Sequence, residues 1–213
     1  MYITRRAKNY IKKTAQKQNF SLQKNSFDVL YRYSLLAKEQ EYRLLFCRML
    51  MYNKDAEVCN ANYKHLPIQV SQAYAAKLVL NDSNDIHNAF LMSLGHEMTH
   101  KDNDIKVIKG MFIKNGTKFL AHVNEVHADF GAVQKLANNN REKQLKAMKY
   151  KQSYKKNVDV SDFCHPSWNQ RYNYIEKYNF DEKLIRQIAA DVGCTNEKLI
   201  EKAIRHFDII RLN

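Results

Sequence analysis

Apolar residues recur near helical spacing along most of the chain, and this pattern predicts a mainly helical fold. In the clearest case, Phe27, Leu30, Tyr42 and Met49 fall close to one helical face, which predicts an amphipathic helix over residues 27–52. Caps and turn residues mark where other helices begin and end. Helices are expected over 85–100 and 117–138, and onward from His165-Pro166-Ser167, Asp181 and Thr195. Residues 1–24 are expected to form a basic helix or a frayed arm, and residues 141–156 a lysine-rich helix or a flexible loop.

One short stretch, Leu66–Ser71, alternates apolar and polar residues with Ile68 and Val70 on one face, and so predicts a strand. Pro67 cannot donate a hydrogen bond to a neighbouring strand, which favours an edge position. The chain has only 5 Gly and 2 Pro, too few for the many tight turns of a sandwich or propeller. The expected fold is therefore α+β and mostly α, with a helical core and a small edge-stranded sheet.

The length of 213 residues is enough for one core without disulfide staples. We expect one compact unit with three regions. These are an N-terminal helical region with a basic arm over 1–58, a central region over 59–178 that carries the chemistry described below, and C-terminal helices over 179–213.

Positive charge is concentrated in two segments. The chain has 35 Lys and Arg against 22 Asp and Glu, a net charge of +13. Residues 1–27 hold seven basic and no acidic residues, and residues 141–156 hold seven basic and one acidic, so these segments carry the whole excess. We interpret both as accessory segments outside a balanced body, suited to solubility or to weak docking on nucleic acid or an anionic membrane surface. For residues 141–156, a lid is the alternative.

The cysteines and the N-terminus bear on the cellular compartment. Cys47, Cys59, Cys164 and Cys194 are scattered without paired spacing, which predicts buried free thiols and not a disulfide framework. No apolar stretch follows the basic N-terminus as it would in a signal peptide. None approaches the roughly 18 apolar residues of a membrane span. We therefore expect a cytoplasmic protein without a transmembrane segment.

The sharpest chemical pattern is Gly95-His96-Glu97-Met98-Thr99-His100, which falls in a predicted helix. Residues four apart share a helix face, so His96 and His100 can both bind one Zn²⁺ through a ring nitrogen. Glu97 lies about 100° further round the helix, beside the open position, where it can accept a proton from water. This spacing predicts a zinc-dependent hydrolase.

A second helical pattern supplies the third ligand that zinc requires. Glu125 and Asp129 are four apart on the next predicted helix, so they share one face. Glu125 can bind the metal, and Asp129 can accept a hydrogen bond from the nitrogen of a zinc histidine that faces away from the metal. Gly95 and Gly131 cost helix stability, which predicts that they permit a close approach of the two helices.

HEMTH followed by NEVHAD resembles the gluzincins, the thermolysin-like metallopeptidases, whose signature is HExxH followed by NExxSD or ExxAD. The segment HPSWNQR, residues 165–171, is similar to an element of the CAAX prenyl protease and heat-shock membrane protease family, which also has a short strand before its HExxH helix. That family is usually membrane-anchored, whereas no span is predicted here. The resemblance covers about residues 60–178 and implies a zincin-like catalytic region over 59–178, with His96, His100 and Glu125 as ligands, Glu97 as base, Asp129 behind the ligands, and His165 and Arg171 beside the site.

His165 and Arg171 each leave two roles open. His165 stands before Pro166 at a predicted helix start, where it can donate a hydrogen bond to the oxyanion of a tetrahedral intermediate or occupy the open metal position in a resting state. Arg171 can pair with a carboxylate near the site or lie on the surface.

We therefore expect a zinc-dependent metalloendopeptidase in which Glu97 is the general base and a peptide substrate pairs with the strand Leu66–Ser71. One alternative is a regulatory metalloprotease of the ImmA/IrrE type, which cleaves a repressor, because Asp129-Phe130 fits the pattern of that group. A second alternative is a non-catalytic module that binds nucleic acid through the basic segments, with a structural zinc or none.

Overall fold

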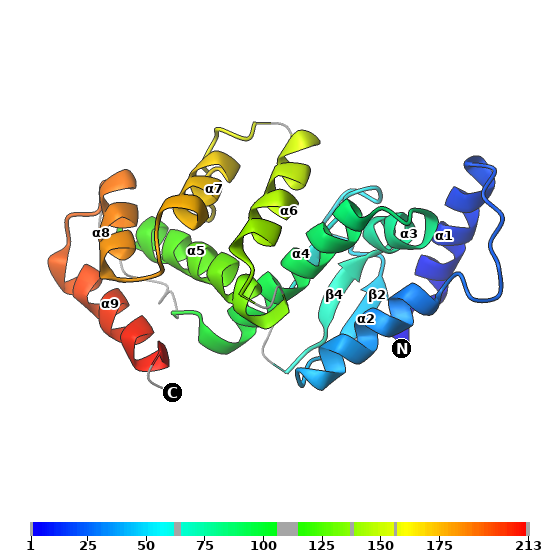
Figure 1. The fold of residues 1–213 in the computed structure, drawn as a ribbon, viewed down its shortest axis with the longest axis horizontal. Helices are drawn as coiled ribbons and strands as arrows, with labels where there is room; N and C mark the ends of the chain where they lie inside the picture. The colour runs from blue at the N-terminus through cyan, green and yellow to red at the C-terminus, as the bar shows by residue number, and fades with distance from the viewer. Residues whose placement is uncertain (1, 62–64, 106–114, 137–138, 156, 212–213) are drawn as a thin grey trace.

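The computed structural model describes residues 2–61, 65–105, 115–136, 139–155 and 157–211 (Figure 1). It is mostly helical with one small sheet, which confirms the expected α+β, mostly α fold. The helices are α1 (Arg5–Lys17), α2 (Asp28–Glu39), α3 (Gln72–Leu80), α4 (Asn84–Asn103), α5 (Gly116–Leu136), α6 (Arg141–Ser153), α7 (Trp168–Lys177), α8 (Glu182–Asp191) and α9 (Glu197–Arg211). The strands are β1 (Tyr2–Ile3), β2 (Leu44–Cys47), β3 (Cys59–Asn60) and β4 (Ile68–Ser71).

The sheet has the order β1-β2-β4-β3. β2 pairs with β1 and β4 in parallel, and β3 pairs with β4 antiparallel. Ile68 and Val70 are both buried, as their alternation predicts. The expected edge position of this strand is wrong, because β4 has a neighbour on each side. Pro67 precedes the first paired residue, where its missing N–H removes no hydrogen bond from the ladder.

The predicted helix over 27–52 is also wrong in its second half. α2 ends at Glu39, the chain turns at Glu41 in a left-handed conformation with φ of 64°, and β2 follows. Leu44 and Phe46 are buried because β2 pairs with β4, about 24 residues later in the chain. Apolar spacing alone does not separate a short buried strand from the continuation of a helix.

The two basic segments are packed elements and not appendages. α1 is amphipathic and buries Ala7, Ile11 and Ala15, and it lies beside α3. α6 buries Ala147 and Met148 against α4 and α7. The interpretation as segments outside the body is therefore wrong for both helices. Most of their lysines and arginines cover the outer faces, and a basic outer face looks the same in sequence whether or not the opposite face is packed.

The core is divided among three clusters around the central pair α4 and α5. One joins the sheet to α1–α4, a second joins α5 to α8 and α9, and a small third one holds Met92, Met148 and Ile175. In Figure 1, α1 and α2 lie toward one end of the long axis and α8 and α9 toward the other, with α4 and α5 between them. Contacts between β2 and β4 and between α5 and α8 link the three regions expected from the sequence.

Helix caps largely follow the sequence signals. Ser167 caps α7 in a capping box with Gln170, and Asp181 Oδ1 accepts a hydrogen bond from Leu184 N at 3.0 Å at the start of α8. α9 begins one residue later than expected, because Asn196 and not Thr195 accepts from the backbone at the start of the helix.

All four cysteines are free, as expected. Cys47 and Cys194 are buried, but Cys164 is exposed, which contradicts the expectation for that residue. Within the described ranges, no helix combines the length and the apolar character needed to cross a bilayer.

Candidate metal centre

The centre is built on the contact between α4 and α5, and glycines allow these helices to approach closely. A Cβ atom added at Gly131 would lie 2.2 Å from Thr99 Oγ1 on α4. A Cβ added at Gly95 would lie 3.0 Å from the backbone Cα of Ala132 on α5. Any larger residue at Gly131 therefore requires the helices to move apart, and the close approach expected from the sequence is present.

Three side chains from these two helices converge as a possible metal site. The Nε2 atoms of His96 and His100 are 3.0 Å apart. Glu125 Oε2 lies 3.4 Å from His96 Nε2, and Glu125 Oε1 lies 3.3 Å from His100 Nε2. Donor atoms of a tetrahedral zinc site, with bonds of about 2.0–2.1 Å, stand about 3.3 Å apart. The donors present therefore match one metal ion in number, chemistry and spacing.

Hydrogen bonds fix the orientation of both histidine rings. His96 Nδ1 lies 2.9 Å from Asp129 Oδ1, so Asp129 holds the nitrogen that faces away from the donor cluster. Asp129 is fully buried and receives two hydrogen bonds from Arg171, from Nε at 2.7 Å and from Nη2 at 2.6 Å. His100 Nδ1 lies 2.8 Å from Asp104 Oδ1. Sequence reasoning missed Asp104, although its spacing of four from His100 was a usable signal.

The charges of these groups are strongly coupled. Burial would raise the pKa of Glu125, but hydrogen bonds from His100 and His96 outweigh it and hold this pKa well below its usual value. Burial would lower the pKa of His100, yet Asp104 and Glu125 raise that pKa to about 10. The ionised carboxylates thus favour positive charge at the histidines, which a divalent cation would supply.

Glu97 faces the cavity next to the donor cluster. Its Oε2 accepts a hydrogen bond from the backbone N of Ala61, just after β3, at 2.5 Å. Burial raises the pKa of Glu97 above its usual value, although His96 and His100 act in the opposite direction. A carboxylate with a raised pKa beside the metal donors is suited to accept and return a proton near neutral pH.

His165 lies beside the centre and outside the donor cluster. Its Nε2 is 3.7 Å from Glu125 Oε1, and its side chain is half-exposed. Among the described residues, the set whose donor atoms all lie within 4.8 Å of one another contains His96, His100 and Glu125 but not His165. Asp162, which sequence reasoning missed, fixes His165 because its two carboxylate oxygens accept from Nδ1 at 3.0 and 3.1 Å. This geometry favours the hydrogen-bonding role of His165 over the ligand role.

The donor cluster opens into a cavity of about 730 Å³. Its walls come from β3, α4, α5, α6 and the segment before α7, and they include Glu97 and His165. Lys151 and Lys155 also line it, from α6 and just beyond. Sequence reasoning assigned both lysines to an accessory segment and missed their place in the site.

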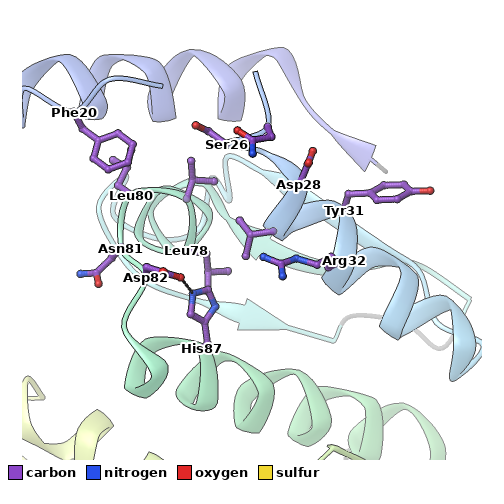
Figure 2. A pocket seen from close by; sticks show the side chains of 13 residues that line it. Phe20, Ser26, Asp28, Tyr31, Arg32, Leu78, Leu80, Asn81, Asp82 and His87 are labelled. Carbon is purple, nitrogen blue, oxygen red and sulfur yellow. Dashed lines mark ion pairs between the residues drawn. The ribbon is translucent and has the colours of Figure 1, made fainter. Parts of the chain in front are cut away.

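A separate cavity of about 870 Å³ lies between α2, α3 and the start of α4 (Figure 2). Figure 2 shows Asp82 beside His87, whose Nε2 is 4.0 Å from Asp82 Oδ1, with Phe20 and Tyr31 further away. Its lining residues do not include the donor cluster, which is the only such group in the described part of the chain. We therefore place the candidate chemistry at the α4–α5 contact.

No family model, curated protein or solved structure matches this chain. The resemblance to gluzincins therefore stays a prediction, and the function has to be argued from the geometry of the centre.

Proposed function

We propose that this protein is a metal-dependent peptidase, with zinc held by His96, His100 and Glu125. The single observation that carries the proposal is the spacing of three donor atoms that suits one tetrahedral ion, on a cavity wall that also presents Glu97. When bound, the metal would supply Lewis-acid polarisation of the scissile carbonyl and of a water molecule. The proposed reaction is hydrolysis of peptide bonds.

The other steps of the proposed reaction are assigned to side chains around the metal site. Glu97 takes a proton from the attacking water and later returns it to the leaving amine, which a buried carboxylate with a raised pKa can do. His165, whose Nδ1 donates to Asp162, donates a hydrogen bond from Nε2 to the developing oxyanion in its doubly protonated form. Asp129 and Arg171 do not touch the substrate; they hold the ring of His96 in place.

The substrate backbone needs a strand edge near the centre. The pairing with Leu66–Ser71 expected from the sequence is wrong, because β4 is flanked by β2 and β3. β3 is an edge strand of the sheet, and its residues Cys59 and Asn60 line the cavity of the donor cluster. We therefore propose that an extended peptide lies along β3 and forms main-chain hydrogen bonds there.

The proposal is tested by comparing the wild-type protein with Glu97→Gln, both purified without added metal. We expect about one equivalent of zinc in each, and hydrolysis of labelled casein by the wild type only. Removing a general base costs about 10²–10⁴-fold in rate. Glu57→Gln is the matched control, because Glu57 lines the same cavity but pairs with Lys77 at 2.9 Å.

Two results would contradict the proposal. One is a full metal content in both His96→Ala and His100→Ala, which would place the metal elsewhere. The other is turnover by Glu97→Gln at the wild-type rate, which would exclude Glu97 as the base. Metal without any hydrolysis would favour the alternative of a non-catalytic module.

A further inference from the structure

Lys151 lies in the wall of the metal-site cavity, close to the proposed base. Its Nζ donates a hydrogen bond to Ser93 Oγ on α4 at 2.6 Å. Ser93 and Glu97 are four residues apart on that helix, so their side chains share a face. The ammonium group is thus about one helical turn from Glu97, on the side of α4 that a substrate would face. The indole ring of Trp168, 5.1 Å from Nζ, covers it from α7.

The ammonium group of Lys151 forms no ion pair within the described part of the chain; its contacts are the ones to Ser93 and Trp168. Ser93 cannot neutralise the charge, because a hydroxyl group is itself neutral; its own proton is donated to the carbonyl of Ala89. An ammonium group has three N–H donors, and Ser93 uses one of them. The remaining donors are available to a group that enters the cavity.

Most other charged groups of the cavity are paired within the described part of the chain; the exceptions are Glu97, which accepts a hydrogen bond from the backbone of Ala61, and Lys155. Glu57 binds Lys77, and Asp104 and Asp162 bind His100 and His165. The carboxylate of Glu125 faces the two metal histidines. Positive charge is therefore in excess on the wall formed by α6.

Holding an uncompensated lysine here is costly. Burial, followed by the nearby charges of Arg171 and Lys155, lowers the pKa of Lys151 to about 8, which still leaves it mostly protonated at neutral pH. If Lys151 served only to attach α6 to α4, a neutral side chain would do so without this cost. A negatively charged ligand bound to Lys151 would remove this energetic cost.

We propose that Lys151 binds a carboxylate of the peptide substrate, beside the scissile bond. The inference rests on the proposed peptidase function and adds a substrate class, namely peptides that present an acidic side chain near the cleaved bond or a free C-terminal carboxylate. Lys155, also on the cavity wall, adds a second positive charge that attracts such peptides.

The test uses quenched fluorescent peptides of one alanine-rich sequence, in which a single Glu is moved through the positions on both sides of the cleavage point. Each is compared with its Gln counterpart, and the C-terminus is either free or amidated. For the wild type we expect kcat/KM to be about tenfold higher for the best acidic peptide than for its neutral match, as one charged hydrogen bond allows. If the preference is lost when Glu is replaced by Gln, Lys151 recognises a side-chain carboxylate. If it is lost when the C-terminus is amidated, Lys151 recognises the C-terminal carboxylate.

Variants of Lys151 test whether this residue causes the preference for acidic peptides. Lys151→Met should bring the acidic-to-neutral ratio to about one, and Lys151→Glu should invert it. Lys149→Met is the matched control, since Lys149 is an exposed lysine of the same helix that does not line the cavity. It should keep the wild-type ratio. Thermal unfolding and zinc content check that each variant is folded and loaded.

A binding measurement separates failure of this inference from failure of the proposed function. Fluorescein-labelled versions of the same peptides are titrated with zinc-loaded Glu97→Gln protein, alone and combined with Lys151→Met, and anisotropy is followed. One possible outcome is that the wild type cleaves no peptide, yet Glu97→Gln binds the acidic peptides about tenfold more tightly than the neutral ones and the added Lys151→Met change abolishes this difference. The carboxylate-binding site would then be supported and the peptidase function would not. A wild-type ratio within twofold of one for every peptide pair, or an unchanged ratio in Lys151→Met, would overturn the inference.

Discussion

The ion pair between Asp129 and Arg171 should be a main determinant of the stability of the centre. Asp129 is fully buried, and Arg171 is nearly so. Two hydrogen bonds of 2.6 and 2.7 Å join them. Arg171→Met keeps much of the apolar stem but removes the guanidinium, so that the ring of His96 is the remaining partner of the carboxylate. Breaking a buried pair in this way costs about 3–5 kcal/mol, because the carboxylate stays buried without its permanent cation.

The assay is urea unfolding followed by circular dichroism, with a chelator present so that metal binding does not contribute to the free energy of unfolding. We expect Arg171→Met to lose about 3–5 kcal/mol. The double variant Arg171→Met/Asp129→Asn should recover at least about 1 kcal/mol, because asparagine removes the buried charge while its oxygen still faces His96. Arg141→Met is the control, since Arg141 bonds the neutral Asn179 at an exposed site.

The reasoning would be refuted by a loss below about 1 kcal/mol in Arg171→Met with an unchanged urea dependence, which is the range of an ordinary surface change. A double variant that is no more stable than Arg171→Met would also refute it. That result would mean that the orphaned charge of Asp129 is not the source of the loss.

Two further predictions concern helix contact and pH. Gly131→Ala should destabilise the protein by about 1–2 kcal/mol and lower its zinc content, because the clash with Thr99 outweighs a helix-propensity gain of about 1 kcal/mol. Adding Thr99→Ala should recover part of this loss. A Gly131→Ala protein that is more stable than the wild type in urea unfolding would contradict the prediction. The acidic-to-neutral kcat/KM ratio should be constant between about pH 5.5 and 7, where the peptide carboxylate is ionised, and fall as pH rises through about 8, since Lys151 is charged only below its pKa. Arg171 and Lys155 lower that pKa, and Cys59 and Asp129 act in the opposite direction. A ratio that stays flat to pH 9.5 would exclude Lys151 as the source of the preference.

The sequence predicted the local part of the centre well, because helical spacing determines which residues share a face. His96 and His100 lie one turn apart on α4, and Glu125 and Asp129 lie one turn apart on α5. The spacing is a property of the helix and needs no knowledge of the fold. The choice of partner between the two helices came from zinc's need for a third ligand and was supported by the resemblance to gluzincins, and the structure brings the four side chains together.

What the sequence did not show depends on contacts between distant segments. β2 was taken for helix because its burial comes from pairing with β4. The interior position of β4 depends on β3, a strand of two residues with no sequence signal of its own. The roles of Asp162 and Lys151 depend on which loop and which helix close the cavity. A periodicity argument does not contain such information.

The basic segment 141–156 combines two kinds of lysine that look alike in sequence. Lys146 and Lys149 are exposed, and Lys146 pairs with Glu142 on its own helix. Lys151 instead bonds α4 and faces the cavity. The accessory role and the lid role were posed as alternatives for the whole segment, but α6 is a packed wall of the cavity and its two faces differ in role. Its outer face supplies charge to solvent, while one inner lysine carries the specificity proposed above. Changes that neutralise the segment as a whole would therefore mix two effects that single variants separate.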